Sequence, residues 1–199
     1  MKVAILIDGG NLRVLARMAG YRHDPSYIEK VAHACVEPEE RILRVLYYDC
    51  APYNGTTRLP VSGAQREFAG SDRWLHELAQ RDLIAVRLGV LKFRGYRPLN
   101  VPVSPTNLTD ADFEPVFEQK GVDMRIGLDI AHYCANKAVE RIVLLTQHTD
   151  CVPAMKHARK SGAQVVLIKL PNARFAPELV EHADIVRAVD WPAHDDPVH

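Results

Sequence analysis

Acidic side chains follow three apolar runs of the sequence, at the points where those runs end. They are Asp8, Asp49 and Asp150, and His148 precedes Asp150 by two residues. Carboxylates that converge on one point repel each other and lose hydration, so a hard divalent cation usually compensates them. Oxygen-rich sites of this kind suit Mg²⁺ or Mn²⁺. The pattern therefore indicates a divalent-metal site if the three runs end side by side.

Two further carboxylates, Asp123 and Asp129, lie on a segment with helical spacing, residues 122–136. Asp123 opens that segment, where a negative charge also favours the helix dipole without any metal. Asp129 lies six residues further on, which places it about 120° around the helix. One straight helix cannot aim both side chains alike, so Asp129 is interpreted as a positioning group.

Each member of this set also has a purely structural explanation. Asp8 could cap the next helix or bind the turn at residues 9–11, and Asp150 could cap the helix that follows it. Asp49 precedes a Pro-rich loop, which favours a turn residue over a ligand. A histidine at a strand end, such as His148, is more often a satisfied structural group than a ligand. The set as a whole is therefore more informative than any one member.

The segments around these side chains alternate between apolar strands and helices. That alternation predicts an α/β protein with a parallel sheet covered on both faces. In such sheets ligands bind outside the carboxyl ends of the strands, where the acidic side chains are expected. The expected strands are residues 3–7, 41–48, 83–90, 141–145 and 164–170, with a short edge strand at 184–189. The expected helices are residues 12–20, 25–36, 71–80, 122–136, 152–160 and 177–183.

Two stretches interrupt this alternation. Residues 50–70 begin as a loop that holds Pro52, Asn54-Gly55 and Pro60. Residues 91–119 contain four prolines, and we predict a loop or hairpin insertion there. An insertion of this length in a compact domain is often functional.

The second stretch carries basic and aromatic side chains that could contact a substrate. Phe93 and Tyr96 are interleaved with the basic residues, and such a mixture suits single-stranded nucleic acid. A solvated hairpin without that role is the alternative interpretation. The basic candidates are Lys92, Arg94, Arg97 and Lys120.

Composition limits the partners and the location of the protein. Lys plus Arg and Asp plus Glu both number 25 in 199 residues, which argues against a polybasic nucleic-acid coat but allows a local patch. No apolar run approaches the roughly 20 residues of a membrane span, so no membrane partner and no signal peptide are expected. The four cysteines form no CxxC pair, and reduced thiols in a cytoplasmic protein are the simplest interpretation. We expect one domain at 1–191 and a flexible C-terminal tail at 192–199.

Three motifs resemble the NYN domain group, which includes the LabA-like proteins and belongs to the PIN-like nuclease superfamily. They are IDGGN at 7–11, YYDCAP at 47–52 and QKGVDMRIGLDIAHYC at 119–134. The resemblance covers residues 2–189. It implies a PIN-like three-layer α/β/α sandwich with a central, mostly parallel sheet, and a metal-dependent ribonuclease site built from acidic residues.

The resemblance also carries over site residues by position. Asp8, Asp123 and Asp150 match the acidic, metal-holding site of the family. Asp129 matches the second acidic position of the KGVD helix, and Asn11 matches the polar residue of the first turn.

One motif departs from the family. Where the family usually has SGDxDF, this chain has TQHTDC at 146–151, so His148 replaces the first aspartate. Loss of a carboxylate weakens affinity for Mg²⁺, whereas an imidazole better suits Mn²⁺ or a softer transition metal. The change permits three interpretations: an altered metal preference, reduced activity, or a retained fold with only a binding role.

The leading hypothesis is an enzyme that hydrolyses RNA phosphodiester bonds. Asp8, Asp123 and Asp150 would hold one or two Mg²⁺ or Mn²⁺ ions. Asn11 would bind the phosphate or fix Asp8, and His148 would be a ligand or a proton donor. The alternatives are a module that binds RNA or a protein partner, and a metal-dependent phosphatase for small phosphate esters. The RNA target, endo- or exonucleolytic action and the oligomeric state, with a homodimer as one option, stay open.

Overall fold

The apolar runs of the sequence form a seven-stranded sheet in the computed structural model, which describes residues 1–103 and 106–193. The order is β6-β5-β2-β1-β7-β8-β9, and each neighbouring pair is parallel except β5 with β6. The strands are β1 (Lys2–Asp8), β2 (Arg41–Cys50), β5 (Ile84–Pro98), β6 (Phe113–Lys120), β7 (Arg141–Leu145), β8 (Gln164–Lys169) and β9 (Ile185–Ala188).

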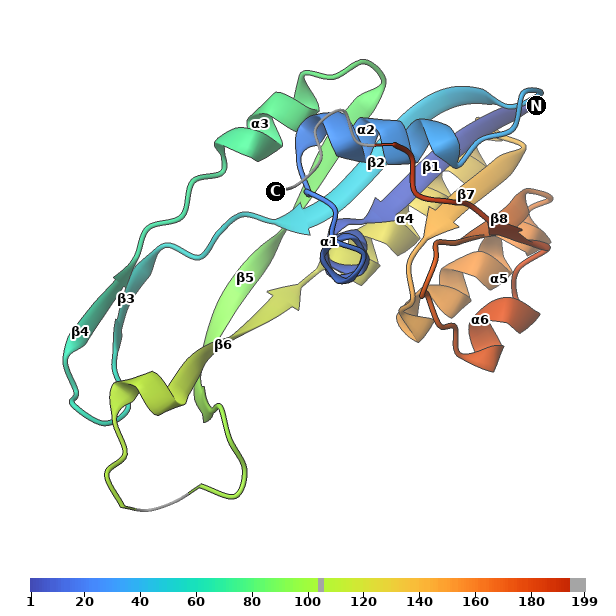
Figure 1. Cartoon of the computed structure of the whole chain (residues 1–199). Coiled ribbons are helices and arrows are strands. Elements are labelled where there is room, and N and C mark those ends of the chain that lie inside the picture. Colours follow the sequence, from blue (N-terminus) through green and yellow to red (C-terminus); the bar gives the residue numbers. More distant parts are fainter. Residues whose placement is uncertain (104–105, 194–199) are drawn as a thin grey trace.

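Helices cover both faces of this sheet (Figure 1). In β1, Val3, Ile5 and Ile7 are buried in the core on one face, and Ala4 and Leu6 are buried on the other. Successive strand residues point to opposite faces, so a strand buried on both sides is apolar throughout. The predicted three-layer α/β/α sandwich with a mostly parallel sheet is therefore confirmed. One face packs on α1 (Gly9–Met18), α2 (Pro25–Ala34) and α3 (Arg73–Ala79), and the other on α4 (Val122–Ala135), α5 (Val152–Lys160) and α6 (Pro177–Glu181).

The stretch at 50–70, which was expected to begin as a loop, has a loop at 51–54 and then a small hairpin. Its strands are β3 (Gly55–Arg58) and β4 (Gln65–Phe68), and they pair with each other in a sheet of their own. The expected strand at 83–90 continues as β5 to Pro98 and pairs with β6, so the insertion predicted at 91–119 contains a β-hairpin. We call residues 55–68, 90–98 and 113–120 the arm, which projects from the sandwich in Figure 1.

Aromatic side chains join the two hairpins of the arm. Ring centroids in the cluster of Tyr53, Phe68, Phe93 and Phe117 lie 5.5–6.2 Å apart. The Thr57 hydroxyl also lies 2.8 Å from the Tyr96 hydroxyl. Aromatic pairs contribute about 0.5–1.5 kcal/mol each beyond area burial. The sequence pattern did not indicate the β3–β4 hairpin, because these contacts join residues far apart in the sequence.

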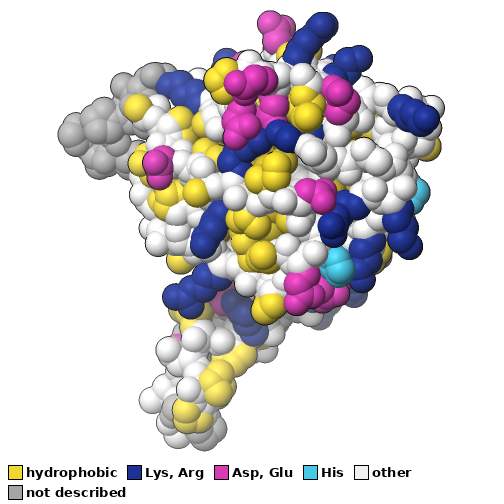
Figure 2. Space-filling view, turned by 90° about the vertical axis from the view of Figure 1, so that its right-hand side faces the viewer, with side chains coloured by type: hydrophobic (Ala, Val, Ile, Leu, Met, Phe, Trp, Pro, Cys, Tyr) yellow, Lys and Arg dark blue, Asp and Glu magenta, His cyan; other side chains and the backbone are white. Residues whose placement is uncertain are grey.

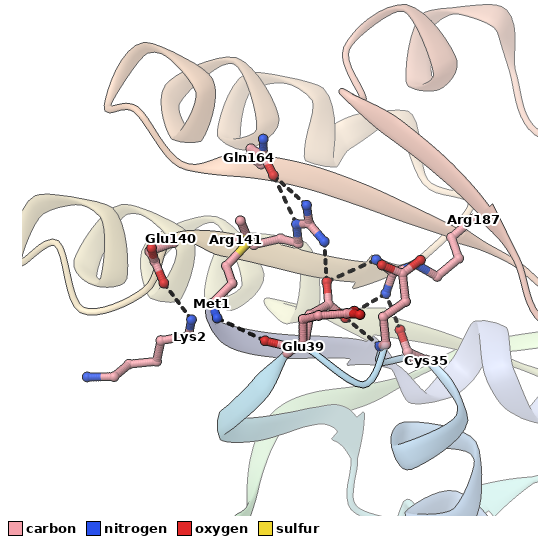
Figure 3. A network of polar contacts seen from close by, with 10 residues as sticks. Met1, Lys2, Cys35, Glu39, Glu140, Arg141, Gln164 and Arg187 are labelled. Atoms are coloured by element: carbon pink, nitrogen blue, oxygen red, sulfur yellow. Dashed lines mark hydrogen bonds and ion pairs between the residues drawn. The ribbon is translucent and has the colours of Figure 1, made fainter.

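A network of charged side chains fastens the amino ends of the strands (Figure 3). Glu40, just before β2, has a side chain that is only 1% exposed. It accepts hydrogen bonds from Arg187 Nη1 and Nη2 at 2.8 and 2.9 Å, and it also pairs with Arg141. Arg141 Nη2 in turn donates to Gln164 Oε1 at 2.6 Å. The network therefore ties β2, β7, β8 and β9 together.

The far edge of the sheet is β9. Figure 2 views the face that carries α5, α6 and β8, where apolar side chains form a band between charged ones. Val180, Ile185 and Val186 are exposed apolar residues of α6 and β9. Of the predicted tail at 192–199, Pro192 O accepts a hydrogen bond from the Tyr27 hydroxyl at 3.2 Å, and residues 194–199 lie outside the described residues. None of the described helices has the length and apolar character needed to span a membrane.

Candidate metal centre

The junction between β1 and α1 places Asp8 at the carboxyl edge of the sheet. Asp8 ends β1, and its Oδ1 accepts a hydrogen bond from the Asn11 N–H at 3.1 Å, so it caps α1. A Cβ at Gly9 would lie 2.3 Å from the Tyr47 hydroxyl and 2.7 Å from the Tyr48 carbonyl oxygen. Only glycine therefore lets the chain turn from strand into helix this close to β2.

Asp8, Asp123 and His148 form one compact group at this edge. One potential ligand atom from each lies within 4.8 Å of the others. His148 Nδ1 is 3.4 Å from Asp123 Oδ1 and 3.8 Å from Asp8 Oδ2. The Asp8 side chain is 1% exposed, whereas Asp123 and His148 are 35% and 52% exposed. The group thus has a buried wall and an open side that a small ligand can reach.

Thr146 connects two members of the group and was not singled out from the sequence. Its hydroxyl donates to Asp8 Oδ2 at 3.2 Å and accepts the His148 N–H at 3.1 Å. Thr146 is almost fully buried. Its position directly after the apolar run at 141–145, beside the neighbouring strand that ends in Asp8, is the signal that could have found it.

The electrostatics of the group fit a cation. Burial raises the pKa of Asp8, and nearby Asp123 raises it further, while the Asn11 N–H, His148 and Thr146 act in the opposite direction. Among the described residues, the buried Oδ1 of Asp123 has no hydrogen-bond partner. A buried carboxylate, a second carboxylate oxygen that receives no hydrogen bond from the described residues, and an imidazole 3.4 Å from that oxygen form a donor set that suits Mn²⁺ or Mg²⁺.

Asp49 is a buried strand residue, and its interpretation as a turn residue is wrong. The strand β2 continues through Cys50 because Asp49 and Cys50 still pair with β5. Asp49 Oδ2 pairs with Arg13 and accepts from the Tyr47 hydroxyl at 3.1 Å, and Gln119 Nε2 lies 3.5 Å from Oδ1. Burial raises the pKa of Asp49, and Arg13 opposes that shift. Asp49 thus has a permanently charged partner, Arg13, which Asp8 lacks among the described residues.

Asn11 and Gln147 link the first turn to the segment after β7. Asn11 Nδ2 donates to Gln147 Oε1 at 2.7 Å, and Gln147 Nε2 donates to the Arg174 carbonyl at 2.6 Å. The buried Oδ1 of Asn11 has no partner in the described part of the chain. Asn11 is therefore held beside Asp8 by both its backbone and its side chain.

Asp129 and Asp150 lie apart from the compact group. Asp129 accepts hydrogen bonds from the Tyr48 hydroxyl at 2.9 Å and from Arg87 Nε at 3.2 Å, so it fastens α4 to β2 and β5. Asp150 is exposed in the 3₁₀ turn at Thr149–Cys151 and offers no ligand atom to the group of three.

The predicted basic contacts lie on the arm, and most are paired with acidic side chains. Arg94 and Lys120 both pair with Glu118, and Arg97 Nε lies 2.6 Å from Glu114 Oε1. Lys92 is exposed and forms no ion pair with the described residues. Phe93 packs in the aromatic cluster between the hairpins. The aromatic and basic side chains that were predicted to contact a substrate therefore lie in different surroundings.

Together, the three-layer sandwich and the acidic group at the carboxyl ends of its strands define an α/β protein with a candidate divalent-metal centre. The chain belongs to the NYN domain family, whose model matches residues 2–190. The resemblance stated from the sequence motifs is thereby confirmed.

Two further comparisons bear on the chain. A search of curated proteins finds no match. Among solved structures, the chain is similar to a protein of unknown function from Vibrio parahaemolyticus RIMD 2210633, with a TM-score of 0.54 and 18% identity over 96% of this chain and 93% of that one. At this identity the likeness supports the fold alone.

Proposed function

We propose that the protein is a metal-dependent ribonuclease that hydrolyses phosphodiester bonds of single-stranded RNA. The observation that carries the proposal is the compact group of Asp8, Asp123 and His148 in a chain of the NYN family, because domains of this family generally act on RNA with divalent metals. A divalent ion held there would activate water and stabilise charge on the leaving oxygen.

The geometry supports different roles for the proposed site residues. Asp8 and Asp123 would hold the ion through oxygen atoms, and His148 would be its third ligand or donate a proton to the leaving group. Asn11 fixes Asp8 through its backbone N–H. Asp129 would act as a positioning residue, since its contacts with β2 and β5 set the rotation of the helix that carries Asp123.

Asp150 and the arm complete the proposal. Asp150 is exposed two residues beyond His148, where it could meet a second ion. Of the predicted substrate contacts, Lys92 is the exposed cation without an acidic partner among the described residues. Arg94, Arg97 and Lys120 would have to break their ion pairs with glutamates before they could bind phosphate. All four cysteines are unpaired thiols, which supports the proposed cytoplasmic location. The homodimer stays a prediction.

The test is cleavage of a labelled single-stranded RNA with Mg²⁺, Mn²⁺ or a chelator. We expect metal-dependent cleavage, and Asp123→Asn should lower its rate by about 100-fold or more because a ligand to the ion is lost. Asp123 is partly exposed, so the variant should still fold. Asp82→Asn, an exposed aspartate ahead of β5, is the matched control.

Two other outcomes would redirect the proposal. If the folded protein cleaves no RNA with any metal, the binding-module hypothesis is favoured. The exposed imidazole of His148, which stands where the family has a carboxylate, would then explain the lack of cleavage. Hydrolysis of p-nitrophenyl phosphate without RNA cleavage would instead favour the phosphatase hypothesis.

A further inference from the structure

A second feature of the same edge is a cavity of about 610 Å³ between α1, the segment that joins α1 to α2, the chain after β2, and α3. Cavities that hold small ligands usually measure about 300–1,000 Å³. Its walls include Arg13, Arg17, Arg22, His23 and Trp74. No acidic side chain lines it within the part of the chain that the structure describes.

The charge of the cavity is positive and partly uncompensated. Arg13 is paired with Asp49, but Arg17 and Arg22 are exposed and form no ion pair within residues 1–103 and 106–193. His23 is neutral at physiological pH because burial, assisted by Arg13, lowers its pKa to about 4. Arg17 and Arg22 therefore line the cavity without an acidic partner in the described part of the chain, and guanidinium binds phosphate by bidentate hydrogen bonds.

An aromatic wall faces these charges. The Trp74 ring is held edge-on to His23 at 5.8 Å and to Tyr47 at 6.1 Å, and Arg13 Cζ lies 5.8 Å from its centroid. Trp74 is partly buried and lines the cavity. Stacking of a nucleobase on such a side chain is worth about 1–3 kcal/mol and tolerates any base.

A chain of side-chain contacts leads from the cavity toward the metal centre. Arg13 faces the cavity and binds Asp49, and Gln119 Nε2 approaches the other oxygen of Asp49 at 3.5 Å. The Gln119 amide atoms lie 3.1–3.2 Å from the point where a Cβ of Gly10 would be, and that point is 3.4 Å from Asp8 Oδ1. A nucleotide bound in the cavity would therefore lie on the Arg13 side of these contacts, with the metal centre on their Asp8 side.

We propose that this cavity is a subsite for one nucleotide of the RNA substrate, with the base stacked on Trp74 and the phosphate bound by Arg17 and Arg22. The inference rests on the proposed ribonuclease function and adds the groups that would position the strand.

The test uses the fluorescence of Trp74 in a Trp191→Phe background, since the chain has two tryptophans. Adenosine 5′-monophosphate and a five-nucleotide RNA are titrated in the presence of a chelator, so binding is measured without cleavage. We expect quenching by both probes. The double substitution Arg17→Ala and Arg22→Ala should weaken binding by about tenfold or more, because charge-assisted hydrogen bonds to phosphate are lost. Arg73→Ala, an exposed arginine beside Trp74 that does not line the cavity, should leave binding unchanged.

Anisotropy of a labelled five-nucleotide RNA, with tryptophans intact, repeats the comparison if the Trp191→Phe protein does not fold. Equal affinity of the double variant and its parent would overturn the subsite, as would the absence of any response to the probes. Arginine-dependent binding without RNA cleavage would support the subsite and count against the ribonuclease. Cleavage in the presence of metal, with no arginine-dependent binding, would support the ribonuclease and count against the subsite.

Discussion

Glu40 at the amino edge of the parallel sheet and Asp8 at its carboxyl edge are both buried carboxylates, and they are compensated in opposite ways. At the amino edge, Glu40 is bound by Arg141 and Arg187. Burial alone would raise its pKa, but hydrogen bonds from Arg187, the Glu37 N–H and Arg141 outweigh burial and lower the pKa to about 2. At the carboxyl edge, burial prevails and the pKa of Asp8 is raised.

This contrast separates a structural site from a site that is prepared for a ligand. Arginine side chains from β7 and β9 complete the Glu40 site within the chain. Asp8 has a hydroxyl, a backbone N–H and a half-exposed imidazole as neighbours, and none of these is a permanent cation. A buried carboxylate without a fixed counter-charge is costly, so binding of a cation there restores the balance.

The largest expected effect is at the amino edge. Replacing Glu40 by Gln should lower the free energy of unfolding by about 3–5 kcal/mol, because two buried arginines lose their counter-charge. Urea denaturation measures the change. Glu39→Gln, at the exposed neighbouring position, should stay within about 0.5 kcal/mol of the parent. A similar small change for Glu40→Gln would mean that the network contributes little stability.

The Glu40 site should also make the free energy of unfolding depend on pH in the acid range. Because the folded-state pKa of Glu40 is lowered from 4.5 to about 2, its contribution is fully present above about pH 4.5 and is lost as the pH falls toward 2. Stability measured between pH 5 and 2 should therefore fall more steeply in the parent than in Glu40→Gln. Parallel curves for the two proteins would contradict the assignment.

At the carboxyl edge, Mn²⁺ or Mg²⁺ should stabilise the protein. A cation at a hundredfold excess over its Kd stabilises by about 2.7 kcal/mol if it binds only the folded state. Thermal denaturation with and without the metal measures this shift. Asp123→Asn should lose most of it, whereas Asp82→Asn should keep it. An equal shift in all three proteins would place the cation elsewhere.

The smallest effect concerns His148. Changing His148 to Asp restores the family pattern and should tighten Mg²⁺ binding by about tenfold, equivalent to about 1.4 kcal/mol, because Mg²⁺ prefers oxygen ligands. The metal-free variant should be less stable than the parent, since three carboxylates then repel each other. Calorimetric titration of His148→Asp beside His148→Asn separates the added carboxylate from the lost imidazole. Mg²⁺ affinity that is the same in both variants would show that position 148 does not face the ion.

The sequence allowed the sheet and part of the metal group to be predicted because both depend on local patterns. Apolar runs identify buried strands, and Asp8 and Asp123 stand directly at the end of a strand and the start of a helix. His148 was noted as a departure from a motif, and the structure places it beside both carboxylates.

What the sequence did not reveal depends on tertiary pairing. Asp49 resembles a turn residue until β5 is known to pair with it. Arg94 resembles a free cation until the register of the hairpin places Glu118 beside it, and that register shifts near Gly95. Thr146 acquires its role only because β7 lies next to β1.

The strand β5 belongs to two parts of the molecule at once. Its first half pairs with β2 inside the sandwich, and its second half pairs with β6 in the arm. From β6 the chain passes through Gly121, with φ of 80°, directly into the helix that carries Asp123. Gly121 and Val122 are the two residues between the end of β6 at Lys120 and Asp123. The pairing of β6 with β5 therefore also fixes where the helix that carries Asp123 begins.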